Sequence, residues 1–138
     1  VNWGDLDYLI IDMPPGTGDI QLTIAHELKI TGVLIVSMPQ EVVIGDVQRS
    51  ISLYRDKAVN IIGVIQNMVS YACEKCGHQQ QIFPGSAKNI LGVPSLGELI
   101  LDTDFCDAGN VGTPFVLSNQ SGEIFNAFQS IAEKLEKL

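Results

Sequence analysis

The chain alternates short apolar runs with longer segments in which apolar residues recur every three or four positions. Three of the runs are continuous and rich in Ile and Val, which is typical of strands buried on both faces of a parallel sheet. They are Tyr8–Ile11, Val33–Val36 and Ile61–Ile65, and a fourth, weaker run is Ser95–Leu99. The pattern therefore predicts four strands, the first of which ends on Asp12.

Helical periodicity occupies the segments between these runs. The first predicted helix has Asp19 as its N-terminal cap and ends at Gly32, and its shared face is Ile20, Ile24 and Leu28. The second covers about residues 42–57, with the apolar stripe Val43, Val47, Ile51 and Tyr54. The last has Ser121 as its cap and Glu123 in its first turn, and its stripe is Ile124, Phe128, Ile131, Leu135 and Leu138.

The order of these elements predicts the fold class. Strand and helix alternate twice, a third strand is followed by a polar excursion, and a final strand and helix complete the chain. This alternation indicates an α/β fold, with a mostly parallel sheet, right-handed crossovers and helices on both faces. We expect residues 1–138 to form the C-terminal part of a single domain, in which the excursion, residues 67–81, is the one long irregular segment. Long loops on such scaffolds are often functional.

Composition narrows the classes of partner. The 138 residues are 46% apolar, enough for one domain with a core, and the formal net charge is −8. A domain with this net negative charge is a poor candidate for binding nucleic acid or an anionic membrane surface, because like charges repel. No apolar run approaches the roughly 20 residues that span a bilayer. The chain begins on Val1 without a signal peptide, so we expect it to be a piece of a longer protein.

The stretch Ile10–Asp19, IIDMPPGTGD, looks at first like a phosphate loop, but Asp19 stands where such a loop has its lysine. Its position after an apolar strand suggests a different part of a nucleotide site. A strand that delivers Asp12 to its carboxyl end is the Walker B arrangement, in which the carboxylate faces the Mg²⁺ shell. Gly16 and Gly18 would let the backbone approach a γ-phosphate and change shape when it leaves.

Each of these interpretations has a plainer alternative. Asp12 could equally be a solvated strand end. Asn67 follows the third predicted strand at the same sheet edge, where its amide could contact a purine base or simply brace a loop. A complete phosphate-loop motif is absent from the sequence, so the phosphate cradle would belong to a segment upstream of Val1.

The excursion contains a pair of closely spaced cysteines. Cys73 and Cys76 are separated by two residues and followed by Gly77, a spacing at which two thiolates can reach one metal centre. Zinc sites and iron–sulfur clusters usually take four protein ligands, so two copies of the loop across a two-fold axis would complete the set. A redox dithiol or a half-formed zinc knuckle is the alternative. We read Cys106 as a half-buried filler and His78 as an ordinary exposed histidine.

Taken together, these motifs resemble the Mrp/Nbp family of P-loop iron–sulfur cluster carrier ATPases and, more distantly, the MinD-type ATPases. The matching stretches cover nearly all of the chain and are DYLIIDMPPGTGD, VSMPQEV, GVIQNM, CEKCG, LGVPSLGEL and AGNVGTP. The resemblance implies a homodimer that binds ATP with Mg²⁺ and holds a labile 4Fe-4S cluster between its protomers. It also implies that the cluster is passed to apo iron–sulfur proteins.

The resemblance assigns roles residue by residue. Cys73 and Cys76 match the cluster ligands, and Asp12 matches the Walker B acid. The segment from Pro15 through Gly16 to Asp19 matches the switch that senses the γ-phosphate. The residues matching the nucleotide side of the fold are Asn67, at the adenine base, and Pro39 and Gln40, in the turn beside the nucleotide.

Two departures from the family pattern stand out. The Walker A loop is absent, and the stretch Ile82–Pro94 is shorter than usual, which predicts a clipped helix after the cysteine loop. The resemblance implies a cytoplasmic protein, or a mitochondrial matrix protein for an organellar homologue. The alternatives are a zinc-stapled dimerisation module and a MinD-type positioning ATPase. The latter would usually have an amphipathic membrane-targeting tail, whereas we expect the final helix to pack on the sheet.

Overall fold

The computed structural model describes residues 1–73, 75–83 and 92–137. Ten helices and strands lie within these described residues. In chain order they are α1 (Asp19–Glu27), β1 (Val33–Ser37), α2 (Glu41–Asp56), β2 (Ile61–Gln66), β3 (Ser70–Ala72), β4 (Gln79–Gln81), β5 (Ser95–Glu98), α3 (Thr103–Asn110), α4 (Phe115–Ser118) and α5 (Glu123–Leu135).

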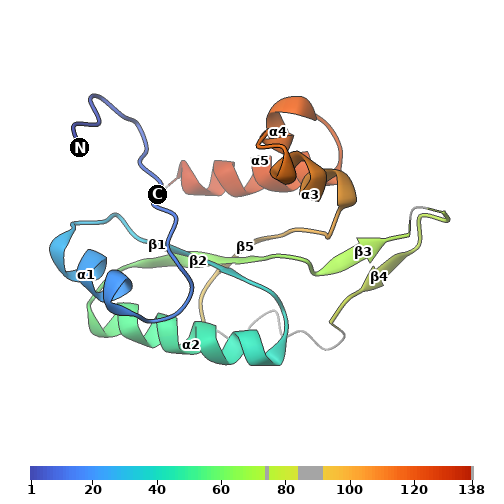
Figure 1. Cartoon of the computed structure of the whole chain (residues 1–138). Coiled ribbons are helices and arrows are strands. Elements are labelled where there is room, and N and C mark those ends of the chain that lie inside the picture. Colours follow the sequence, from blue (N-terminus) through green and yellow to red (C-terminus); the bar gives the residue numbers. More distant parts are fainter. Residues whose placement is uncertain (74, 84–91, 138) are drawn as a thin grey trace.

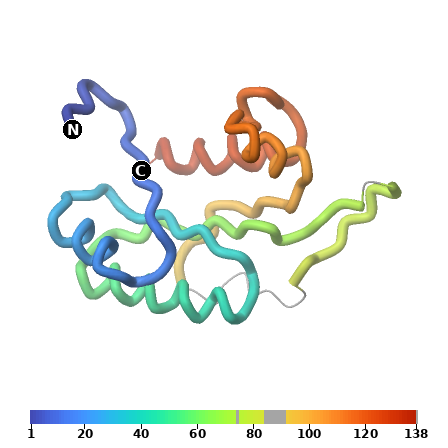
Figure 2. Tube along the Cα trace, in the orientation of Figure 1, coloured from blue at the N-terminus to red at the C-terminus, as the bar shows by residue number. Residues whose placement is uncertain are grey.

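The central sheet is parallel and has helices on both faces. Its strand order is β1-β2-β5, and both neighbouring pairs run parallel. Figures 1 and 2 show α2 along one side of this sheet and α5, with α3 and α4, along the other. The predicted α/β fold class is confirmed, and so are the strands predicted around residues 33–36, 61–65 and 95–99.

The core lies between the sheet and α2. Ile35 of β1, Val64 of β2 and Ile51 of α2 form a cluster in which no side chain is more than 7% exposed. Val47, one turn before Ile51, packs against the same cluster, as its stripe predicts. Together, these side chains fix α2 against the sheet, so the turn that joins β1 to α2 has a defined position.

The strand predicted at Tyr8–Ile11 is wrong. These residues lie in an irregular segment, and all four side chains are exposed, Ile10 by 84%. A strand exists only where its backbone N–H and C=O groups pair with a neighbour, and β1 has β2 as its one partner among the described strands. An apolar run predicts a tendency to form a strand, whereas pairing also needs a partner.

Several predicted helix limits also need correction. The cap of α1 is Gly18, not Asp19, which is the first helical residue, and α1 ends at Glu27, short of Gly32. The cap of α5 is Gly122, whose φ of +96° suits glycine, not Ser121. The predicted clipped helix after the cysteine loop falls largely on residues 84–91, outside the described residues, and so does Leu138.

The final third of the chain adds a small helical unit. Asp102 caps α3 by accepting a hydrogen bond from the Phe105 N–H at 2.9 Å. The Phe105 ring then lies 5.5 Å from that of Phe115 in α4 and 5.8 Å from that of Phe128 in α5. These ring contacts join the three helices. Within the described residues, each helix is too short or too polar to cross a bilayer.

Candidate functional site

The cysteine segment is a β-hairpin, not the irregular excursion that we expected over residues 67–81. Strands β3 and β4 pair antiparallel in the register Ser70↔Gln81 to Ala72↔Gln79. The cysteine loop closes this hairpin: the Cys73 N–H donates to the His78 carbonyl at 3.0 Å and the Gly77 N–H to the Cys73 carbonyl at 2.8 Å. Gly77 has a φ of +69°, which glycine adopts without strain.

Backbone hydrogen bonds attach the hairpin to the carboxyl end of the sheet. The Val69 N–H donates to the Leu99 carbonyl at 3.0 Å, and the Leu101 N–H to the Ser70 carbonyl at 2.8 Å. The hairpin therefore continues the line of β2 and β5, and Figure 1 shows it projecting beyond the sheet. Strands β3 and β4 have only three residues each, and β4 reads QQQ, so the sequence carries too little apolar alternation to predict them.

The two close cysteines lie at the tip of this projection. Cys73 is half-buried and Cys76 is exposed. Cys106 is also exposed, on α3, so the expectation of a half-buried filler is wrong. Among the described residues, no three His, Cys, Asp or Glu side chains gather as a metal-ligand group. The chemistry that this hairpin offers is a pair of thiols on an exposed loop.

Three predicted nucleotide-site residues come together at the carboxyl edge of the sheet. The Asn67 N–H donates to the carbonyl of Ser37, the last residue of β1, at 2.8 Å, which brings Asn67 beside the turn through Pro39 and Gln40. Pro39 is buried and Gln40 is exposed as the N-cap of α2. Strand ends of this kind are where open α/β sheets gather ligands.

One end of the Asn67 side-chain amide already has a hydrogen-bond partner. Its Oδ1 accepts a hydrogen bond from the Met68 N–H at 3.0 Å, and Met68 has a φ of +57° that is unusual for its type. The Nδ2 group is thus left to donate to a ligand. Both alternatives for Asn67, loop bracing and base contact, fit this geometry, because the two ends of the amide are used separately.

The predicted switch segment lies before and within the start of α1. Gly16 is exposed with a φ of +100°, and Gln21, only 4% exposed, donates from Nε2 to the Pro14 carbonyl at 2.6 Å. Asp12 and Asp19 are exposed. Because the strand predicted before it does not form, Asp12 is not at a strand tip in this structure. Its carboxylate makes no hydrogen bond or ion pair with the described residues.

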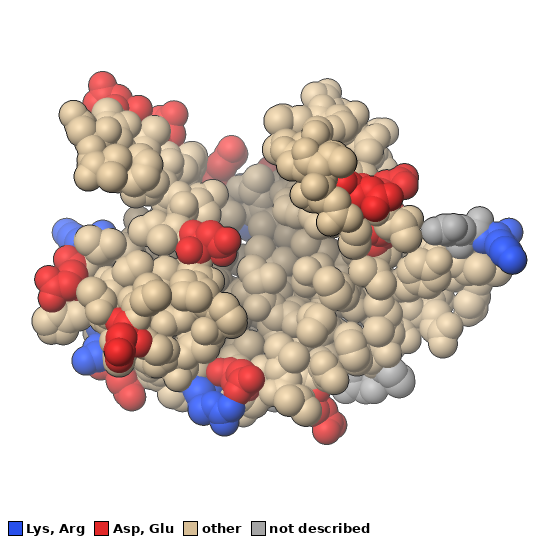
Figure 3. All heavy atoms as spheres, in the orientation of Figure 1, with Lys and Arg blue, Asp and Glu red and all other residues tan. Residues whose placement is uncertain are grey.

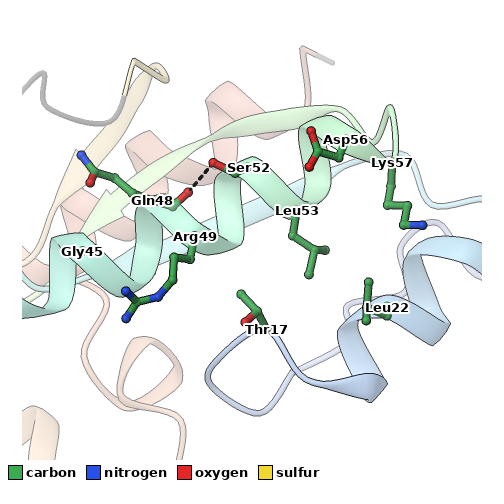
Figure 4. A pocket seen from close by; sticks show the side chains of 9 residues that line it. All are labelled: Thr17, Leu22, Gly45, Gln48, Arg49, Ser52, Leu53, Asp56 and Lys57. Carbon is green, nitrogen blue, oxygen red and sulfur yellow. Dashed lines mark hydrogen bonds between the residues drawn. The ribbon is translucent and has the colours of Figure 1, made fainter.

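An open hollow of about 660 Å³ separates the switch segment from the outer side of α2. In Figure 4 the side chains of Thr17 and Leu22 point toward α2, and Leu53 points back toward them. This arrangement places the switch segment beside α2. The Pro39–Gln40 turn and Asn67 form a separate group at the sheet edge, so the structure brings together only part of the predicted site.

A second, polar cavity of about 310 Å³ lies between the cysteine hairpin and the start of α5. Gln79 of β4 and Glu123 of α5 both line it, and their side chains are hydrogen-bonded to each other. No sequence pattern predicts this contact, because the two residues are 44 positions apart. On the face in Figure 3, acidic groups are widespread and basic groups lie toward its margins.

Comparison with known proteins identifies relatives of the whole chain. The family model ParA, described as NUBPL iron-transfer P-loop NTPase, matches residues 1–136. The "Iron-sulfur cluster carrier protein" of Aquifex aeolicus is 36% identical over 99% of this chain, which covers 38% of that protein. The "Iron-sulfur protein required for NADH dehydrogenase, mitochondrial" of Arabidopsis thaliana is 37% identical over 99% of the chain and 45% of that protein.

Solved structures agree with this relationship. A nucleotide-binding protein of Archaeoglobus fulgidus, in complex with ADP, is 31% identical and superposes with a TM-score of 0.72 over 89% of this chain and 51% of that one. The cell division ATPase MinD of Pyrococcus furiosus, at 21% identity and a TM-score of 0.63 over 78% and 43%, shares the fold. The chain spans less than half the length of the two curated relatives named above.

Proposed function

This chain belongs to the ParA family of NUBPL iron-transfer P-loop NTPases, and on that basis we propose that the full-length protein is an ATP-dependent carrier of iron–sulfur clusters. The observation that carries the proposal is the hairpin that presents Cys73 and Cys76 beyond the carboxyl end of the sheet. Two thiols on a short projecting loop, one half-buried and one exposed, can take up a cluster and release it to another protein. The cargo would be a labile 4Fe-4S cluster.

The cluster would lie between two copies of the protein. One hairpin offers two cysteine thiolates, and a 4Fe-4S cluster usually takes four. A two-fold axis near the hairpin tips would bring the same pair from a second copy, since a two-fold interface presents the same surface from both partners. Because each cysteine thiol must lose its proton to bind iron as a thiolate, cluster uptake would release protons.

The nucleotide would occupy the carboxyl edge of the sheet. Asn67 would donate from Nδ2 to the adenine ring, and Pro39 and Gln40 would line the base. Asp12 would face Mg²⁺ through water, and Gly16 to Asp19 would sense the γ-phosphate. For Asp12 this assignment rests on the sequence motif, because Asp12 does not follow a strand in this structure.

Nucleotide state and cluster affinity would then be coupled. Asn67 precedes β3 by only three residues and is bonded to the end of β1, so a movement at the base site would be passed to the cysteine hairpin through this short segment. Hydrolysis would relax the switch segment and shift α1. Any such coupling must be reciprocal: ATP changes the affinity for the cluster by the factor by which the cluster changes the affinity for ATP.

The acceptors would be apo iron–sulfur proteins, and the compartment would be the cytoplasm or the mitochondrial matrix. An acidic surface makes nucleic acid an unsuitable partner. The alternatives, a zinc-stapled dimerisation module and a positioning ATPase, lack a supporting observation of comparable weight, because the family match extends across the cysteine hairpin.

The test is anaerobic reconstitution of the full-length protein with ferrous iron and sulfide. We expect uptake of about four irons per two copies, absorption at roughly 400 nm and a dimer by native mass spectrometry. An ATP analogue should change the rate at which a chelator removes the iron. A cluster on a monomer, or no uptake at all, would contradict the proposal. Colourless protein with zinc shared by two copies would favour the dimerisation module.

A further inference from the structure

The cysteine hairpin is attached unevenly to the rest of the protein. Strand β3 is bonded through its backbone to the segment after β5, whereas β4 pairs with β3 alone among the described strands. A side-chain contact links β4 to a helix instead: Nε2 of Gln79 lies 3.0 Å from Oε2 and 3.3 Å from Oε1 of Glu123. The charged carboxylate makes this a charge-assisted hydrogen bond.

The contact between Gln79 and Glu123 joins the base of the cysteine loop to the start of α5. In register, Gln79 pairs with Ala72, the residue before Cys73, so it lies at the base of the cysteine loop. Glu123 is the first residue of α5. That helix is fixed on the sheet by Ile131, which is 5% exposed, and by Lys134, whose ammonium group donates to the Leu96 carbonyl. The contact thus joins the base of the cysteine loop to a helix that is packed on the sheet.

We propose that Glu123 is a positioning residue for the cysteine loop: by holding Gln79, it fixes the direction in which the hairpin presents Cys73 and Cys76. This inference rests on the proposed function for its consequence, which is tighter retention of the cluster. A loop that is ordered before the cluster arrives loses less conformational freedom on binding, and the affinity rises accordingly. Weakening the contact would make the cluster easier to release.

The contact can be broken and restored by exchanging its two side chains. Gln79→Glu sets two carboxylates against each other. Gln79→Glu combined with Glu123→Gln regenerates the amide–carboxylate pair with its direction reversed and the net charge unchanged. Gln80→Glu is the matched control, because it adds the same charge one residue away, at a side chain that lines the same cavity, whereas the hydrogen bonds to Glu123 come from Gln79.

The first measurement uses the full-length protein without cluster and follows amide hydrogen exchange at Cys73 and Gly77, the two donors inside the loop. We expect Gln79→Glu to accelerate exchange at both amides about three- to tenfold, as loss of one modest hydrogen bond implies. The exchanged pair should return to the rate of the natural protein, and Gln80→Glu should not depart from it. The second measurement, iron release from the reconstituted dimer to a chelator, should follow the same order.

The outcomes separate this inference from the proposed function. If Gln79→Glu exchanges like the natural protein, or no faster than Gln80→Glu, Glu123 does not position the loop. Failure of the exchanged pair to restore the natural rate would also overturn the proposal. If the natural protein takes up no cluster, the proposed function is wrong, while the exchange rates of the cluster-free protein still decide whether Glu123 holds the hairpin.

Discussion

Ile131 of α5 lies directly over Gly97 of β5, so close that a Cβ atom added to the glycine would stand 2.7 Å from Ile131 Cγ1 and 2.9 Å from Cδ1. Real Cβ atoms essentially never approach another atom so closely. Helix and strand can therefore meet only because position 97 has no side chain. This close approach fixes α5 on the sheet, and with it the first turn of the helix, which faces the cysteine hairpin.

Gly97→Ala should consequently destabilise the protein. The new methyl group would push α5 away from β5 or force Ile131 out of its rotamer, and we expect the free energy of unfolding to fall by about 1–3 kcal/mol. Chemical denaturation of the full-length protein measures this change. A cluster-free sample also shows whether the displacement loosens the Gln79–Glu123 contact, because hydrogen exchange at the amides of Cys73 and Gly77 would rise.

Gly45→Ala provides the matched control for this substitution. Gly45 lies inside α2, and a Cβ atom there would meet nothing within 4 Å. Alanine is the better helix former, so this change should stabilise the protein by about 0.5–1 kcal/mol. Equal effects of the two substitutions would show that crowding by Ile131 is not the reason for glycine at position 97.

The sequence pattern is sufficient to predict those elements that pack against neighbours close by in the chain. The alternation of strand and helix from Val33 to Gln66 predicts β1, α2 and β2 to within a residue or two, because the apolar stripe of α2 matches the faces of its two neighbouring strands. The same reasoning fails at Tyr8–Ile11, where the run is apolar enough but the described residues offer no strand to pair with it.

The candidate site divides in the same way. The cysteine pair and Asn67 are visible in the sequence because their residue types and spacing carry the chemistry. The contact between Gln79 and Glu123 is invisible, because it joins residues 44 positions apart whose types are ordinary on a surface. The hydrogen bond from Gln21 to the Pro14 carbonyl is not predictable for a related reason. The apolar stripe of α1 points to Ile20 and Leu28, whose side chains are exposed, and not to the polar Gln21.

The hydrogen bond between Gln21 and Pro14 leads to a second prediction. Gln21 is almost fully buried and donates to the Pro14 carbonyl at 2.6 Å, so it holds the glycine turn of the switch segment against α1. Gln21→Ala should lower the free energy of unfolding by about 1–3 kcal/mol, because the Pro14 carbonyl loses its donor. Thr23→Ala, which removes an exposed hydrogen bond to the Asp19 carbonyl in the same helix, should change it by no more than about 0.5 kcal/mol. A comparable loss of unfolding free energy in both variants would argue against a stabilising role for the hydrogen bond between Gln21 and Pro14.

A third prediction concerns the amide of Asn67. Asn67→Asp keeps the oxygen that accepts from the Met68 N–H but removes the Nδ2 donor that would contact adenine. We expect ATP to bind about three- to tenfold more weakly in isothermal titration, the equivalent of one hydrogen bond, with little change in stability. Asn60→Asp is the charge control, because it adds the same carboxylate on an exposed residue before the start of β2. An unchanged ATP affinity in Asn67→Asp would leave Asn67 with the loop-bracing role alone.

The last prediction separates cluster ligands from structural cysteines. Cys73→Ser and Cys76→Ser should each abolish the absorption of the reconstituted cluster, because a serine hydroxyl is a poor substitute for a soft thiolate ligand of iron. Cys76 is exposed, so its replacement should change the free energy of unfolding by about 0.5 kcal/mol or less, and ATP affinity should persist. Cys106→Ser, also at an exposed position but on α3, should retain the cluster. Loss of cluster and ATP binding together in the hairpin variants would instead assign the cysteines a role in maintaining the fold, since the hairpin and the sheet edge share the segment from Asn67 to Ser70.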